Sequence, residues 1–96
     1  MKKIELNGIE YEVVENENNC LEEEILKEKV TDYFEPYDYI FGDYAYEKVR
    51  LKGFYDAKNK KATEINNIKN LETYKKEYCS YGSKTFLLKK IKEKHL

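Results

Sequence analysis

The fold is decided by residues 37–56, YDYIFGDYAYEKVRLKGFYD. The segment 37–41 is short, aromatic and extended, and Gly42-Asp43 is expected to turn the chain because both residue types favour turns. Residues 48–55 then alternate as a strand does, with side chains two positions apart on one face. One face carries Val49, Leu51, Gly53 and Tyr55, and the other carries Lys48, Arg50, Lys52 and Phe54. We therefore predict one hairpin whose core face holds Val49 and Leu51.

A second hairpin and a helix are predicted before this stretch. Residues 3–6 and 9–13 alternate around Asn7-Gly8, a pair that favours a tight hairpin because both residues tolerate a positive φ. Apolar residues from 21 to 34 then recur with the helical period of 3.6 residues. We expect a helix from about residue 20 to 34, capped by Asn18 or Asn19 and ended by Pro36.

Three further elements are predicted after it. Residues 61–65 can return as a paired strand. A second helix, capped by Asn67 or Asn70, would place Leu71, Tyr74 and Tyr78 on one stripe and end at Gly82. Residues 84–91 have the pattern of a last strand.

The resulting order, roughly ββαβββαβ, indicates the α+β class. We expect a mostly antiparallel sheet of about five to six strands with two helices packed on one face. A chain of 96 residues has room for one core, so we expect a single domain spanning residues 1–96. Apolar residues make up 41% and charged residues 39%, which is typical of a globular protein.

The charge is unevenly distributed along the chain. Residues 1–48 carry five lysines and fourteen carboxylates, a net charge of −9, and residues 49–96 carry a net charge of +8. Such asymmetry concerns partners rather than fold. No apolar run approaches the ~20 residues of a membrane span, and no signal peptide follows Met1, so we expect a cytoplasmic protein without a membrane partner.

No constellation typical of an enzyme or of a metal or cofactor site is visible. The single histidine, His95, is the penultimate residue, where a side chain cannot hold the geometry of a general base. Cys20 and Cys79 with one histidine do not supply four zinc ligands. The glycines match neither a P-loop nor a dinucleotide fingerprint. We therefore expect no catalytic residue, no cofactor and no metal.

A candidate ligand-binding face lies on the predicted hairpin. Alternating cations with an aromatic residue are a combination that binds single-stranded nucleic acid. The face comprises Asp43, Tyr44, Tyr46, Lys48, Arg50, Lys52 and Phe54, and its ligand would be single-stranded RNA or a ribonucleoprotein. The alternative is an ordinary strand with a solvated cationic face. Arg50 is the one arginine beside seventeen lysines, which suggests a forked donor for Asp43 or for an external phosphate.

The acidic half offers a different interpretation. Its carboxylates are either a solubilising surface or a patch that docks a basic protein, as an inhibitor of a nucleic-acid-binding protein would. The patch would comprise Glu10, Glu12, Glu22, Glu23 and Glu24. We expect a monomer or a weak homo-oligomer.

An ordered set of short motifs runs over roughly residues 11–91: Tyr11–Asn16, Tyr37–Ile40, Gly42-Asp43, Arg50–Tyr55, Lys61–Thr63, Glu77–Cys79, Tyr81-Gly82, Phe86 and Leu88–Lys90. In these motifs the chain resembles the YutD-like family, small cytoplasmic proteins of Gram-positive bacteria. The family pattern has tryptophan and glycine where this chain has Tyr44 and Ala45, and a second cysteine where it has Ser83. The resemblance implies a shared fold and imports no activity. A redox or metal role for a cysteine pair is not implied for this chain.

Overall fold

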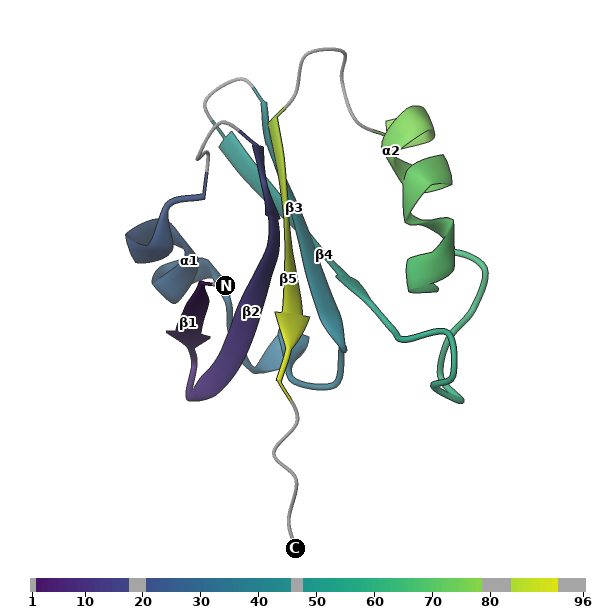
Figure 1. Cartoon of the computed structure of the whole chain (residues 1–96), viewed down its shortest axis with the longest axis horizontal. Helices are drawn as coiled ribbons and strands as arrows, with labels where there is room; N and C mark the ends of the chain where they lie inside the picture. Colours follow the sequence, from purple (N-terminus) through teal and green to yellow (C-terminus); the bar gives the residue numbers. More distant parts are fainter. Residues whose placement is uncertain (1, 18–20, 46–47, 79–83, 92–96) are drawn as a thin grey trace, which may run out of the picture.

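Figure 1 shows a computed structural model of the chain, which describes residues 2–17, 21–45, 48–78 and 84–91. Five strands form one antiparallel sheet in the order β1-β2-β5-β3-β4. The strands are β1 (Lys3–Leu6), β2 (Ile9–Asn16), β3 (Tyr39–Ala45), β4 (Lys48–Phe54) and β5 (Lys84–Lys90). The helices are α1 (Glu23–Lys29) and α2 (Leu71–Tyr78), with 3-10 turns η2 (Asp32–Phe34) and η3 (Ile68–Asn70). The predicted α+β class with an antiparallel sheet and two helices is confirmed.

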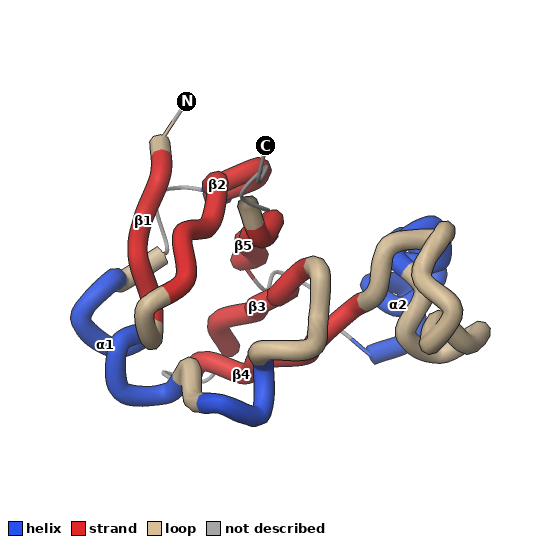
Figure 2. The backbone as a smooth tube through the Cα atoms, turned by 90° about the horizontal axis from the view of Figure 1, so that it is seen from below, coloured by secondary structure: helices blue, strands red, loops and turns tan. Residues whose placement is uncertain are grey.

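The sheet curls, and each helix covers a different side of it. Figure 2 shows α1 on the concave side, between β1 and β4, and α2 on the convex side. The concave core consists of Ile4, Leu6, Tyr11, Leu26, Val30, Phe34, Ile40, Phe86 and Leu88. The convex core is smaller and consists of Phe41, Phe54, Leu71 and Leu87. The expectation that both helices pack on one face was wrong, because β3 and β5 bury alternate side chains on both faces.

The first hairpin forms as the Asn7-Gly8 pair predicts. Asn7 has φ of 53° and Gly8 has φ of 78°, the left-handed conformation that a two-residue hairpin turn needs. Leu6 pairs with Ile9 across this turn. β2 extends beyond the predicted residue 13 to Asn16, with an irregularity between Val13 and Glu15.

The predicted helix over 20–34 was wrong in extent. α1 ends at Lys29, and Val30 is extended with ψ of 107°. Thr31 then caps η2 by accepting a hydrogen bond from the Tyr33 backbone N–H at 3.4 Å. The break directs Val30 and Phe34 into the concave core, where they are 3% and 7% exposed. The caps predicted at Asn18 or Asn19 lie outside the described residues.

The turn expected at Gly42-Asp43 was also wrong. β3 runs straight through this pair, and Gly42 is opposite Leu51 on one side and Phe86 on the other. Gly42 is required here because a Cβ would overlap the ring of Phe86. Gly53 has the same role in β4, where the ring of Tyr37 lies against its backbone.

The predicted strand at 61–65 is a loop. Asp56, Asn59 and Asn66 accept hydrogen bonds from nearby backbone N–H groups at 3.0, 2.9 and 2.6 Å, and these local bonds compete with strand pairing. The predicted cap at Asn67 is confirmed, since its side chain accepts from the Lys69 backbone N–H at 3.0 Å. β5 is confirmed over Lys84–Lys90, and Gly82 lies outside the described residues.

Candidate interaction surface

α2 covers one end of the cationic face predicted on β4, at Phe54. Lys48, Arg50, Lys52 and Phe54 do share one face of β4, the convex one. Phe54 is fully buried, and its ring centroid lies 5.5 Å from Tyr74 and 6.3 Å from Phe41. Phe54 therefore anchors α2 to the sheet, and its ring is not accessible to a nucleic-acid base.

Arg50 is held by Asp43. The Arg50 Nε donates to Asp43 Oδ1 at 2.9 Å, and Nη2 donates to Oδ2, so the guanidinium binds the carboxylate with two parallel hydrogen bonds. Asp43 is 4% exposed and lies directly opposite Arg50 in the β3–β4 register. Arg50 Nη2 also donates to the Tyr78 carbonyl at 3.3 Å. Arg50 therefore connects the end of α2 to the sheet. Of the two targets predicted for Arg50, Asp43 or an external phosphate, the structure shows Asp43.

Two lysines on the same side contact aromatic rings. Lys52 Nζ lies 5.4 Å from the ring centroid of Phe54 and 5.7 Å from that of Tyr74. Lys75, on α2, lies 5.8 Å from the Phe41 centroid and pairs with Glu15 at 3.1 Å. The ring contacts are cation–π interactions. Together with the Lys75–Glu15 ion pair, they link α2 to β2, β3 and β4.

The other predicted residues of this face are dispersed. Lys48 is exposed at the start of β4. Tyr44 lies opposite Val49 and lines a small hollow beside Leu26 of α1, so it faces the concave side. Tyr46 lies outside the described residues. The structure thus separates Tyr44 from Arg50 and Lys52.

The predicted acidic patch is divided between the two sides of the sheet. Tyr11 points into the concave core, so its neighbours Glu10 and Glu12 point to the convex side. Glu12 lies between Lys3 on β1 and Lys89 on β5. The carboxylates of Glu22, Glu23 and Glu24 belong to the start of α1, which covers the concave side, and Lys27 lies 3.9 Å from Glu23 and 3.6 Å from Glu24.

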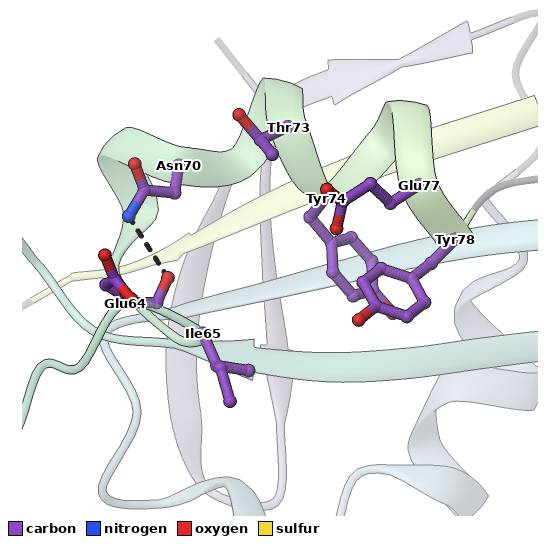
Figure 3. Close-up of a pocket in the computed structure, with 7 residues that line it drawn as sticks. All are labelled: Glu64, Ile65, Asn70, Thr73, Tyr74, Glu77 and Tyr78. Carbon is purple, nitrogen blue, oxygen red and sulfur yellow. Dashed lines mark hydrogen bonds between the residues drawn. The ribbon is translucent and has the colours of Figure 1, made fainter.

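A hollow of about 320 Å³ lies beside α2, and we call it the α2 groove (Figure 3). Tyr74 and Tyr78 stack with ring centroids 4.9 Å apart and an angle of 29° between the rings. Tyr78 is 60% exposed and Ile65 is 72% exposed. The lining residues are Glu64, Ile65, Asn70, Thr73, Tyr74, Glu77 and Tyr78.

No sequence pattern predicted this groove. The pattern around Ile65 indicates a strand, and Tyr78 falls on the predicted stripe of the second helix with Leu71 and Tyr74. The available signal was the spacing of Tyr74 and Tyr78, four residues apart on a helix, which brings their rings together. Ile65 reaches the same hollow because of the path that the loop before η3 takes.

Within the described ranges, no group of three or more His, Cys, Asp and Glu side chains is placed to hold a metal ion. Cys79 and His95 lie outside these ranges. None of the described helices is long and apolar enough to cross a membrane.

Comparison with known proteins gives the family. Residues 5–89 match the YutD-like family, which is described as "Putative antitoxin YutD-like". The chain belongs to this family. It is 41% identical over 88 residues to "Putative antitoxin YutD" of Bacillus subtilis (strain 168), an alignment that covers 92% of this chain and 97% of the relative. The solution NMR structure of protein yutD from B. subtilis superposes with a TM-score of 0.78 at 40% identity, covering 99% of this chain and 87% of that one. The family inferred from the sequence is confirmed.

Proposed function

We propose that the protein is a non-enzymatic binding module of the antitoxin type, which holds a protein partner at the α2 groove. The observation that carries the proposal is the exposure of Ile65 and Tyr78 in one hollow next to Tyr74. Exposed apolar and aromatic side chains gathered in a concave site are typical of protein-binding surfaces, where tyrosine is frequent among the residues that dominate affinity. The name of the B. subtilis relative supplies the class of partner, a toxin.

The groove also has a rigid base. Leu71 is 7% exposed in the convex core, and the Phe54 and Phe41 rings meet Tyr74 edge to face. Arg50 holds the carboxyl end of α2 through Tyr78. A site built on a helix that is packed against the sheet loses less conformational freedom on binding than a site made of loops alone.

Growth of B. subtilis tests this function. The cells would be depleted of the 41% identical relative and would express this chain from an inducible promoter. If the protein restrains a toxin, depletion arrests growth and this chain restores it. Tyr78→Ala and Ile65→Ser should each reduce the rescue, because both remove apolar surface that the partner would cover.

Matched controls are available on other surfaces. Tyr33 is 66% exposed and Val14 is 47% exposed, and neither lines the groove. Tyr33→Ala and Val14→Ser should therefore rescue growth as the wild type does. Normal growth of the depleted cells would contradict the antitoxin role, and full rescue by both groove variants would remove the groove from the binding site.

A second candidate function is binding of single-stranded RNA along β4. It is favoured by Lys48, Arg50 and Lys52, which alternate on the convex face about 7 Å apart. Fluorescence anisotropy with a mixed-sequence single-stranded RNA should then show binding at low salt, with a log–log salt slope of about −2 for three phosphate contacts. Lys48→Glu should weaken it, and Lys58→Glu, in an exposed loop, serves as the control. Lack of binding at low salt would exclude this function.

A further inference from the structure

The α2 groove carries an acidic rim in the basic half of the chain. Residues 57–91 contain three carboxylates, Glu64, Glu72 and Glu77, and two of these line the groove. Glu72 is outside it and lies 3.7 Å from Lys75. Within the described part of the chain, neither Glu64 nor Glu77 forms an ion pair, and no lysine or arginine lines the groove.

The floor of the groove is aromatic and apolar. One face of the Tyr78 ring stacks on Tyr74, and the high exposure of Tyr78 leaves much of its ring open to a ligand. Figure 3 shows the two stacked rings, with Ile65 and the Glu77 carboxylate among the side chains that surround the hollow. A ligand here meets the π-face of a tyrosine, an aliphatic side chain and negative charge together.

We propose that this groove receives an arginine side chain of the protein partner, an inference that rests on the proposed function. The aliphatic stem covers Ile65, the planar guanidinium lies on the Tyr78 ring, and its N–H groups donate to the neighbouring Glu77 carboxylate. Glu64, beside Asn70 at the other end of the hollow (Figure 3), adds negative potential that attracts the cation. An uncharged apolar ligand would desolvate these carboxylates without replacing their hydrogen bonds. A phosphate would be repelled by them, which makes nucleic acid an unsuitable occupant.

Arginine fits better than lysine for a geometric reason. A guanidinium can stack on a ring and present a fork of donors in its own plane, whereas an ammonium is a compact, strongly hydrated charge. The partner surface is therefore expected to be basic. This agrees with the basic partner inferred from the sequence, at carboxylates other than those predicted.

NMR titration of the ¹⁵N-labelled protein tests the inference directly. N-acetyl-arginine amide is the probe, and N-acetyl-citrulline amide is its neutral analogue of the same shape. We expect saturable shifts at the amides of Ile65, Glu77 and Tyr78, with citrulline binding at least tenfold more weakly. Equal binding of the two compounds, or shifts confined to other surfaces, would overturn the proposal.

Charge-neutral variants provide the second arm. The double variant Glu64→Gln/Glu77→Gln keeps the shape of the rim and removes its charge, so arginine binding should fall about tenfold. Glu72→Gln, on the same helix and outside the groove, should leave binding unchanged. An unaltered titration with the double variant would contradict the role of the two carboxylates.

The growth assay separates this inference from the proposed function. If Tyr78→Ala fails to rescue growth while Glu64→Gln/Glu77→Gln rescues fully, the protein-binding function stands and the arginine proposal is wrong. If Tyr78→Ala and Ile65→Ser both rescue growth, the groove is not the partner site, and the arginine proposal fails with it. Loss of rescue in all three variants supports both.

Discussion

Gly42→Ala should destabilise the protein by crowding the concave core. Gly42 has an ordinary strand conformation, so alanine meets no backbone strain there. Its Cβ would overlap the Phe86 ring, which is 1% exposed in the concave core. The ring cannot move without displacing its neighbours, because protein interiors are close-packed.

The size of the effect follows from two opposing contributions. Overpacking of a filled core costs about 1–3 kcal/mol. Alanine restricts the unfolded chain more than glycine does, which returns about 0.4–1 kcal/mol. We therefore expect the free energy of unfolding to fall by about 1–2 kcal/mol, a loss that a domain with a stability of about 5–15 kcal/mol survives.

A double-mutant cycle with Phe86→Leu isolates the cause. Leucine removes the part of the ring that the new methyl group would meet, so the double variant should be little less stable than Phe86→Leu alone. Urea unfolding followed by circular dichroism gives the four free energies, with an expected coupling of about 1–2 kcal/mol. Additivity within about 0.5 kcal/mol would refute the argument. Gly53→Ala is the matched comparison and should also destabilise the protein, since its Cβ would meet the Tyr37 ring at Cγ and that ring packs against Tyr55.

Three further predictions concern polar groups. Tyr11→Phe should raise the free energy of unfolding by about 1 kcal/mol in urea titrations, because the buried Tyr11 hydroxyl has no hydrogen-bond partner among the described residues. The hydrogen bond to Tyr33, followed by burial, raises the pKa of Tyr37 to about 12, so its stabilising contribution is complete below pH 10 and lost as the pH rises toward 12. Tyr33→Phe should return the Tyr37 pKa toward 10 in a titration followed by ¹³C NMR of labelled tyrosine, and an unchanged value would exclude this cause. Arg50→Gln should lower the free energy of unfolding by about 1 kcal/mol, since Asp43 loses a charged, two-pronged donor while the guanidinium is half exposed and partly screened; equal stability in urea would contradict it.

Local sequence patterns correctly predicted the elements that are determined by residues close together in the chain. The Asn7-Gly8 turn, the Asn67 cap and the alternation of β4 each depend on neighbouring residues, and all three are present. The break after α1 also had a signal, since Val30 and Thr31 are both β-branched and Thr31 is a good cap. We nevertheless predicted a single helix across this break, because the apolar stripe with helical period continues through η2.

The wrong predictions concern positions whose structure depends on a residue far away in the sequence. Gly42 resembles a turn residue until the position of Phe86 in β5 is known, 44 residues later in the chain. The alternation of β4 placed Phe54 with the cations correctly. It could not indicate that α2 would cover that face, because an amphipathic stripe shows that one side of a helix is buried and not which surface buries it. The β4 members of the candidate face therefore share one side of the strand, whereas Tyr44 lies on the opposite side of the sheet and α2 covers Phe54.

The central position of β5 has a consequence for biosynthesis. β5 pairs with β2 on one side and with β3 on the other, yet it is translated after the other four strands. Until it emerges from the ribosome, the β1–β2 and β3–β4 hairpins are two separate ribbons, and the edges of β2 and β3 are open to pairing with other chains. β5 contributes to both cores at once, with Phe86 and Leu88 on the concave side and Leu87 on the convex side. The two ribbons are therefore joined in a single late step. A nascent chain stalled before Lys84 is thus the form most exposed to aggregation and to proteolysis.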